Sequence, residues 1–307
     1  MEYIREPFSY ECKGRSVVTL GKFDGVHRGH QMLIGRMEEL AAENDWNTVV
    51  FTFDISPQVC MGSTPRQMLM TNSERKDFIE RMDIDILVEC PFTKEVMNMT
   101  PEKFVTDVLI DRLHAAAVVI GDDFRFGKNR AGDGAFLQKM GKKYGFSVEI
   151  TGKKTDEENG REISSSYVRE EVSAGRLEKA ASLLGYNFYI EGKIVHGRHL
   201  GTTIGIPTIN IVPSGDKLLP PNGVYFSRTE IEGGKCYNSI TNIGVKPTVD
   251  GENLTVETNL FDCDEDLYGK KARVSLLHFS RPEMQFASVD ELKKQMNRDI
   301  AEARKYA

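Results

Sequence analysis

The sequence predicts two domains: a doubly wound α/β domain, followed by a small antiparallel β-barrel with a final α-helix. The first observation is that short β-branched runs alternate with helical segments up to about residue 185, which is typical of a parallel sheet covered by helices. The second is that strand-like segments beyond this point follow one another through glycine turns, with no helix between them. We therefore expect domains of residues 1–185 and 186–307.

The first domain contains five candidate strands, each a short β-branched or apolar run: 16–20, 48–53, 84–89, 116–121 and 146–150. The helical segments between them have recognisable ends. Thr100 stands as a cap before Pro101 at the first helical position, and Gly145 closes a helix that begins near Asp133. These signals predict a parallel sheet with helices in its connections.

The second domain also contains five candidate strands: 192–197, 223–231, 235–244, 254–261 and 271–279. Gly233 and Gly234 suit a hairpin turn between two of them. Ser288 with Glu291 three residues later has the spacing of a capping box and predicts the start of the final helix. Consecutive strands with one closing helix therefore predict a small antiparallel barrel.

The composition limits the class of protein. At 307 residues, with 40% hydrophobic and 28% charged residues, the chain is typical of a globular protein large enough for two cores. A net charge of -6 argues against a surface dedicated to nucleic acid. The N-terminal residues lack the basic and apolar stretches of a signal peptide, and no apolar run approaches the roughly 20 residues that span a bilayer. We expect a cytoplasmic protein without a nucleic-acid or membrane partner.

The cysteines are odd in number and scattered, and none has CxxC spacing: Cys12, Cys60, Cys90, Cys236 and Cys263. This pattern suggests neither a disulfide framework nor a zinc site. We expect reduced and mostly buried thiols.

The segment GKFDGVHRGH, residues 21–30, lies between the first predicted strand and a helix. The helical spacing of Leu33, Met37, Leu40 and Ala41 indicates that helix. Ligands of an open α/β sheet bind beyond the carboxyl ends of the strands, so this turn is a candidate site. Its three glycines let a phosphate approach the backbone, and the N–H groups of the helix start favour an anion.

His27 and His30 indicate the chemistry of this turn. Two imidazoles can donate to phosphate oxygens and stabilise the charge that develops during transfer at an α-phosphorus, without a protein nucleophile. A His-x-x-His pair could instead bind zinc, but no third ligand lies at a usual spacing. The pair could also be purely structural, since short motifs match by chance, whereas the spelling of the turn excludes a GxGxxG dinucleotide site.

These residues resemble the signature of the HxGH nucleotidyltransferase superfamily, and the form FDGVHxGH is similar to that of the bacterial bifunctional riboflavin kinase/FMN adenylyltransferase family, also called FAD synthetases. IGDDFRFGKNRAG (120–132) resembles the family's VGxDFxFGxxRxG, and ISSSYVRE (163–170) resembles ISSTxIR. The resemblance implies a Rossmann-like nucleotidyltransferase domain. It implies nucleotide- and phosphate-binding roles for Gly21, Phe23, Asp24, Gly25, Gly29, Asp123, Ser164 and Ser165, and catalytic roles for His27, His30 and Arg169.

The residue types of the third segment suit this role. Ser164, Ser165 and Arg169 stand at a helix start, where hydroxyls, N–H groups and a guanidinium could reach a triphosphate. Taken alone, the segment could equally be an ordinary serine cap with a solvated arginine.

The second domain resembles the riboflavin kinase module. GTTIGIPTIN (201–210) is similar to the family's GRxxGFPTAN, which implies that Thr208 and Asn210 bind the Mg²⁺ held by the ATP phosphates. Magnesium prefers hard oxygen ligands, and Gly201 and Gly205 suit a loop that closes over phosphate. Read without the family, PTIN is only a turn followed by a strand.

Two further segments match this module, NIGVKPTV (242–249) and VETNLFD (256–262). They place Glu257 where the family carries its catalytic base, and add Asn242 to the implied nucleotide-binding residues. A base is needed because the ribityl hydroxyl of riboflavin is neutral and a poor nucleophile. A strand glutamate could equally be a solvated residue on the outer face of the barrel.

The second domain departs from the family pattern at four positions: Thr202 in place of arginine, Ile206 of phenylalanine, Ile209 of alanine and Asn259 of histidine. The missing arginine removes a bidentate phosphate donor, which Arg198 or His199 could replace. In the first domain, Lys22 replaces an asparagine and Ser166 a threonine. His196 and His199 form a second His-x-x-His pair, which we interpret as loop residues.

The resemblance implies an enzyme that phosphorylates riboflavin to FMN in the barrel and adenylylates FMN to FAD, with release of pyrophosphate, in the first domain. The implied cofactor is Mg²⁺. ATP is the co-substrate, the flavin is substrate and product, and flavoproteins are candidate acceptors.

Two other functions are considered. A different HxGH transferase, acting on phosphopantetheine or a phospho-alcohol, would leave the PTIN and Glu257 segments unexplained. A nucleic-acid-binding barrel is disfavoured by the acidic charge and the lack of a basic, aromatic-rich strand.

Overall fold

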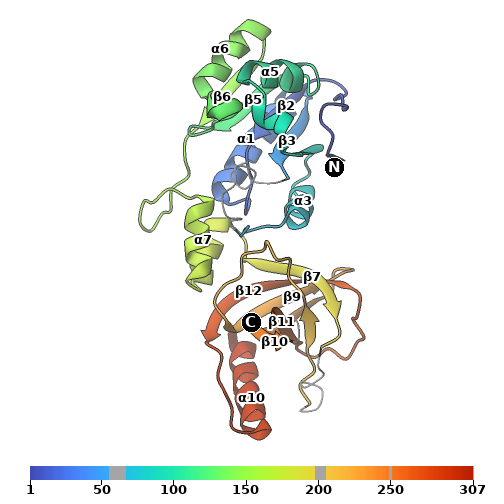
Figure 1. Cartoon of the computed structure of the whole chain (residues 1–307). Coiled ribbons are helices and arrows are strands. Elements are labelled where there is room, and N and C mark those ends of the chain that lie inside the picture. Colours follow the sequence, from blue (N-terminus) through green and yellow to red (C-terminus); the bar gives the residue numbers. More distant parts are fainter. Residues whose placement is uncertain (55–66, 198–204, 249–250, 307) are drawn as a thin grey trace. The chain divides into compact units, whose positions relative to one another are not determined.

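The computed structural model describes residues 1–54, 67–197, 205–248 and 251–306 (Figure 1). Contacts divide the chain into two compact units, Met1–Ser165 and Ser166–Ala307. This division precedes the expected boundary near residue 185 because α8 (Leu177–Leu184) packs against β12 (Lys271–Arg281) of the second unit. Each unit is described by itself.

The first unit is built on a six-stranded sheet in which every strand pair is parallel, with the order β1-β4-β3-β2-β5-β6. All five predicted strands are confirmed, with ends that differ by at most two residues. The edge strand β1 was not predicted, because three residues carry little pattern. The strands are β1 (Glu2–Ile4), β2 (Ser16–Leu20), β3 (Asn47–Phe53), β4 (Ile86–Cys90), β5 (Ala115–Gly121) and β6 (Ser147–Thr151).

The sheet is doubly wound, as the sequence predicts. From β2 the chain proceeds outwards through β3 and β4 on one side, and through β5 and β6 on the other. The connection therefore reverses direction between β2 and β5. The carboxyl ends of these two strands flank the crevice in which such sheets bind ligands.

Helices cover both faces of this sheet. Alternate strand residues, including Val18 and Val118, belong to a buried cluster with Val105 and Leu137 from the helical connections. α1 contacts β2, β3 and β5 through a different buried set, Leu33, Ile34, Met37 and Ala41. The helices are α1 (Arg28–Asn44), α3 (Asn72–Glu80), α4 (Lys94–Asn98), α5 (Pro101–Lys103), a π-helix (Phe104–Ile110), a 3₁₀ turn (Lys128–Arg130) and α6 (Gly134–Tyr144).

The predicted helix ends of this unit are confirmed. The Thr100 hydroxyl accepts from the Lys103 amide, and the chain continues from α5 directly into the π-helix. Asp133 caps α6 by accepting from the Phe136 amide at 2.8 Å, and Gly145 ends it in the left-handed conformation that glycine adopts without strain.

The second unit contains a closed six-stranded antiparallel barrel with the order β10-β11-β8-β7-β12-β9, which confirms the predicted barrel. The strand that follows the turn in PTIN closes it as β8. The remaining elements are α7 (Ser165–Ser173), β7 (Tyr189–Val195), β8 (Ile209–Ile211), β9 (Gly223–Ile231), β10 (Cys236–Thr248), β11 (Gly251–Leu260) and α10 (Val289–Tyr306).

The turn and cap predictions for this unit are confirmed in part. Gly233 and Gly234 both have positive φ in the β9–β10 hairpin. The Ser288 hydroxyl accepts from the Glu291 amide at 3.2 Å, as a capping box requires. The reciprocal half of the box is wrong, because the Glu291 carboxylate accepts from the Ala287 amide instead.

The barrel interior contains a chain of buried hydroxyl groups, hydrogen-bonded in succession at 2.8–2.9 Å: Thr229, Ser239, Ser227, Thr241 and Thr258. A hydroxyl both donates and accepts, so such a chain satisfies itself without water. Because strand residues alternate between faces, the inward Thr258 turns Glu257 and Asn259 away from this interior.

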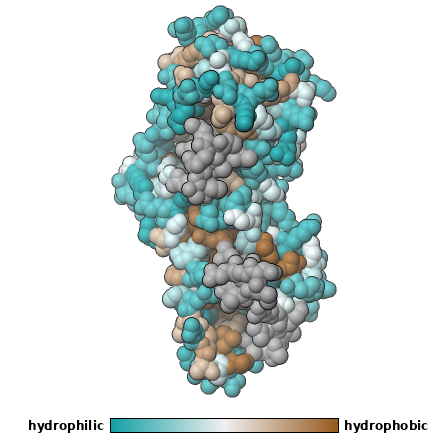
Figure 2. Space-filling view, viewed as in Figure 1, coloured by the Kyte–Doolittle hydropathy of each residue, from teal (hydrophilic) through white to brown (hydrophobic). Residues whose placement is uncertain are grey.

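Within the ranges described above, no helix has the length and apolar character to cross a bilayer. Figure 2 shows a mainly hydrophilic face on which apolar residues form small groups.

Candidate functional site

The first candidate site lies at the switch point of the parallel sheet. The turn of residues 21–30 connects β2 to α1, and Asp123 follows β5, the neighbouring strand. The sequence therefore predicted the position of both segments correctly relative to the sheet, whose strands β2 and β5 are labelled in Figure 1.

The backbone of this turn is held in an unusual conformation. Gly25 has a φ of 81°, while Phe23 and Val26 adopt φ of 47° and 31°, which are rare for residues with side chains and rarest for a β-branched one. Such conformations cost roughly 1–3 kcal/mol each and persist only where the surroundings hold them. Gln31 contributes here, since its side-chain amide donates to the Val26 carbonyl at 2.7 Å.

The two histidines form one packed unit. The rings of His27 and His30 stack with centroids 3.8 Å apart, and the Phe23 ring lies 5.1 Å from His30. A side chain at Gly29 would come within 3.2 Å of the His27 ring, and one at Gly21 would meet the Phe23 ring at the same distance. A side chain at either glycine would therefore be a tight contact that the ring beside it must relieve by a small shift.

His30 is uncharged near neutral pH. Burial lowers its pKa well below 6.5, and electrostatic interactions with His27 and Arg75 lower it further. Its Nδ1 is buried and meets no hydrogen-bond acceptor or donor among the described residues. A neutral imidazole can still donate one hydrogen bond to a phosphate oxygen.

The start of α1 provides further donors. His27 is the N-cap residue, and its side chain makes no capping hydrogen bond. The amides of Arg28, Gly29 and His30 therefore lie in the first turn, where helical geometry offers them no acceptor. Together with the helix dipole they favour an anion at this point.

The predicted serine segment lies against this turn. The Ser165 hydroxyl donates to the Asp24 carbonyl at 2.8 Å, and the Ile163 carbonyl would lie 3.7 Å from a Cβ on Gly29. The Asp24 carboxylate is buried and accepts from the Met70 amide at 3.1 Å, so this oxygen holds backbone. Arg169 lies in α7 of the second unit, and its role stays a prediction.

Charged side chains stand at the edge of the site. Asp123 is exposed, and its carboxylate lies 3.6 Å from the Lys153 ammonium, which also pairs with Glu162 at 2.7 Å. The sequence motifs include Asp123 but not Lys153, which lies just after β6.

The second candidate site is a row of side chains across the barrel. Glu257 of β11 is paired in register with Asn210 of β8 on one side and Asn242 of β10 on the other. Paired residues of antiparallel strands point to the same face, so three predicted site residues lie together. Thr208 precedes Asn210 by two residues, immediately before β8.

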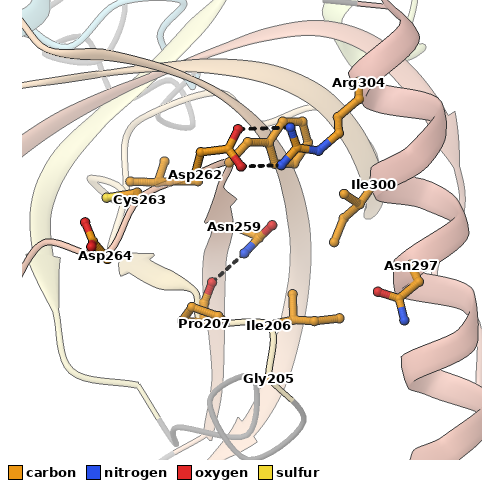
Figure 3. A pocket seen from close by; sticks show the side chains of 12 residues that line it. Gly205, Ile206, Pro207, Asn259, Asp262, Cys263, Asp264, Asn297, Ile300 and Arg304 are labelled. Atoms are coloured by element: carbon orange, nitrogen blue, oxygen red, sulfur yellow. Dashed lines mark hydrogen bonds and ion pairs between the residues drawn. The ribbon is translucent and has the colours of Figure 1, made fainter.

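A cavity of about 510 Å³ is lined in part by the residues that directly precede Thr208 in the chain (Figure 3). Its walls are residues 205–207, residues 259–264 and three side chains of α10, including Arg304. Arg304 forms a bidentate pair with Asp262 at 2.8 and 2.9 Å.

Asn259 of β11 connects this strand with the PTIN segment. Its side chain is buried, and its amide donates to the Pro207 carbonyl at 2.6 Å. The departure from the family's histidine is therefore compatible with an ordered PTIN segment. Gly201, Thr202, Arg198 and His199 lie outside the described residues, so their predicted roles stay predictions.

Within the described ranges, no group of three or more His, Cys, Asp or Glu side chains is arranged to hold a metal ion. Four of the cysteines are free, with Cys12 and Cys90 buried. Cys60 lies outside the described residues.

Comparison with known proteins finds relatives over the whole chain. The FAD synthetase family matches residues 9–167, and the riboflavin kinase family matches residues 184–307. The bifunctional riboflavin kinase/FMN adenylyltransferase of Escherichia coli (strain K12) is 38% identical over 291 residues, 94% of this chain and 92% of the relative. The Bacillus subtilis (strain 168) protein of the same name is 32% identical over 301 residues, 96% and 94% of the two chains.

A solved structure also covers the chain. It is that of a protein named as a macrolide-efflux protein from Streptococcus pneumoniae, 30% identical, with a TM-score of 0.89 over 99% of both chains.

We expect His30 to remain uncharged as the pH falls through 6.5, because its pKa in the folded chain is lowered well below that value by burial. The unfolded chain binds this proton more readily, so the free energy of unfolding should fall as the pH drops below about 6.5. The contribution of this group is at most about 1.4 kcal/mol per pH unit, until the folded pKa is reached. Histidine side-chain NMR between pH 8 and 5 measures the protonation of His30, and urea unfolding over the same range measures the free energy of unfolding.

His30→Gln should lack this part of the pH dependence, whereas the matched change His114→Gln, at a partly exposed histidine of the same unit, should keep it. A His30 resonance that titrates near pH 6.5 would contradict the assignment of a buried, neutral ring.

Proposed function

This chain belongs to the family of bifunctional riboflavin kinase/FMN adenylyltransferases, and we propose that its two candidate sites carry the two reactions separately. The enzyme phosphorylates riboflavin to FMN and adenylylates FMN to FAD, using ATP in both steps. The observation that carries the assignment is that the first unit contains the adenylylation motif residues other than Arg169, and the second unit contains those of the kinase. The FAD synthetase match covers the first set and the riboflavin kinase match the second.

For adenylylation, we propose that the phosphates of ATP bind over the glycine turn and the start of α1. The FMN phosphate attacks the α-phosphorus, a new P–O bond forms, and the bond to the bridging oxygen breaks to release pyrophosphate. Neutral His30 and its neighbour His27 donate to the phosphate oxygens as charge develops. Arg169, Ser164 and Ser165 contact the triphosphate.

No protein base is required in this step, because the attacking FMN phosphate is already an anion. Positioning and electrostatic stabilisation therefore supply the catalysis. The remaining proposed contacts to the nucleotide come from Gly21, Phe23, Asp24, Gly25, Gly29 and Asp123.

For the kinase reaction, we propose that Glu257 takes the proton of the ribityl hydroxyl as that oxygen attacks the γ-phosphorus of ATP and ADP leaves. Its position between Asn210 and Asn242 supports this role. Thr208 and Asn210 supply a hydroxyl and an amide oxygen, the hard ligands that Mg²⁺ prefers, and bound Mg²⁺ would neutralise phosphate charge. Gly201, Gly205 and Asn242 are the proposed nucleotide contacts.

We propose that the cavity beside Pro207 receives part of one kinase substrate. Its volume of about 510 Å³ lies within the usual range of ligand pockets, and Asn259 forms a wall that also holds the PTIN backbone. The hydrogen bond from Asn259 to the Pro207 carbonyl then connects the wall of this cavity with Thr208 and Asn210, the proposed magnesium ligands.

The other partner assignments are also proposals. The acidic net charge supports an enzyme without a nucleic-acid partner. Flavoproteins are proposed as acceptors of the product because FAD and FMN are flavin cofactors. The free, buried thiols of Cys12 and Cys90 support a reducing, cytoplasmic location.

We expect His30→Ala to lower FAD formation from supplied FMN by at least about 10²-fold, because one preorganised donor to the transition state is lost. FMN formation from riboflavin should stay within twofold, since it uses the other unit. Chromatography of both products from one preparation measures this, with His114→Ala as the matched control. Equal loss of both activities in folded protein would overturn the assignment of this turn.

We expect Glu257→Gln to lower the single-turnover kinase rate by about 10²- to 10⁴-fold, because glutamine keeps the size but cannot accept the proton. Riboflavin affinity and the adenylylation of supplied FMN should change little. Glu230→Gln on β9 is the matched control. A kinase rate within threefold of wild type would leave Glu257 without a role as base.

We propose residues 186–307 as the kinase module and expect this fragment to phosphorylate riboflavin. A fragment of residues 166–307 should be more stable, because it keeps the apolar face of α8 and the Glu178–His278 pair. Urea unfolding and kinase assays of both fragments test this. A longer fragment that unfolds cooperatively yet has no kinase activity would show that the division of labour is wrong.

A further inference from the structure

A buried ion pair lies beneath the turn of residues 21–30. Arg75 of α3 and Glu89 of β4 have side chains only 4% and 3% exposed, and Nη2 of Arg75 lies 2.6 Å from Oε1 of Glu89. Neither residue belongs to a motif that the sequence analysis singled out.

The guanidinium of Arg75 ties together three elements at the carboxyl edge of the sheet. Its Nη1 donates to the Lys22 carbonyl at 3.2 Å, and its Nη2 donates to the Phe53 carbonyl at 3.0 Å and to the Asn72 side chain at 3.1 Å. Lys22 is the second residue of the turn, and Phe53 is the last residue of β3. A single rigid side chain thus joins the exits of β2 and β3 to α3.

Glu89 is held on both oxygens. Tyr3 of β1 donates its hydroxyl to Oε2 at 2.5 Å, and Arg5 lies 4.0 Å from the same oxygen. Burial, followed by the bond to Glu89, raises the pKa of Tyr3 to about 12, so this hydroxyl remains a donor at neutral pH. The Glu89 carboxylate, which holds Arg75, is therefore itself held in place by Tyr3 and Arg5.

The small net contribution of a buried ion pair to stability indicates that Arg75 and Glu89 serve to position the backbone. Desolvation offsets most of the attraction in a buried ion pair, so a well-packed apolar pair would serve stability equally well. An apolar pair could not hold a carbonyl at a defined point. Lys22 directly precedes Phe23, the first strained residue of the turn, and strained backbone persists only where its neighbours restrain it.

We propose that Arg75 is a positioning residue for FMN adenylylation: it fixes the Lys22 carbonyl and thereby the strained turn that presents His27 and His30. The inference rests on the assignment of this turn to adenylylation. The charge of Arg75 also contributes, after burial and His27, to the lowered pKa of His30, which is consistent with its closeness to that ring.

Arg75→Lys tests the proposal, because lysine keeps the charge and can pair with Glu89 but lacks the planar fork that reaches several acceptors. We expect kcat for FMN adenylylation to fall about 10- to 100-fold, since small misplacements of catalytic groups have effects of this size. The KM values for ATP and FMN should stay within threefold, and riboflavin kinase activity of the same preparation within twofold. Arg81→Lys, at the exposed C-cap of the same helix, should match wild type.

A folded Arg75→Lys enzyme with adenylylation kcat within twofold of wild type would overturn the proposal. So would a fall matched by the kinase activity, because that indicates general loss of folded protein. If Arg75→Lys does not fold, Glu89→Gln decides: glutamine removes the charge that fixes Arg75 and one of the two carboxylate oxygens, which accept from Arg75 and Tyr3, so kcat should fall threefold or more, whereas wild-type kcat overturns the proposal. His30→Ala, assayed in parallel, separates this failure from failure of the site assignment itself.

Discussion

The reversal of strand order between β2 and β5 is the constraint on which the first site depends. Ligands of such sheets bind at the carboxyl ends of the strands at this point, and the chain leaves β2 there through a turn with positive φ at Phe23, Gly25 and Val26. The stacked histidines, the free amides of α1 and the serine segment all take their positions from this turn. The geometry of this candidate site thus depends on the strand order of the whole sheet.

The second candidate site results from the alternation of side chains between the two faces of the barrel strands. Its inward positions carry hydroxyls that satisfy one another, while the opposite positions on β8, β10 and β11 carry Asn210, Asn242 and Glu257 in one row. Because a closed barrel has no free edge, this row cannot slip in register without disturbing the buried face. Two different architectures therefore each bring polar side chains together in one candidate site.

The sequence predicted the elements with strong local patterns and missed those defined by distant contacts. Five strands of the sheet, the helix ends at Thr100 and Gly145, and the barrel were predicted from periodicity and turn residues. The strand β1 was too short to show a pattern, and Arg75 resembles any helical arginine until Glu89 and the Lys22 carbonyl surround it. Asn259 was read as a departure, but its bond to Pro207 appears only once β11 and the PTIN segment meet. Sequence motifs indicate which residues take part in the chemistry, whereas buried polar residues that hold those motifs in place are recognised only from tertiary contacts.

The central claim is that two separate sites act in succession through FMN. Mixing two folded variants, His30→Ala and Glu257→Gln, each of which alone should make almost no FAD from riboflavin, tests it most directly. If the sites are separate, the first variant supplies FMN, the second converts it, and the mixture forms FAD with free FMN detectable beforehand. If the mixture forms no more FAD than the sum of the two variants alone, although each remains folded, the account of two separate sites is contradicted.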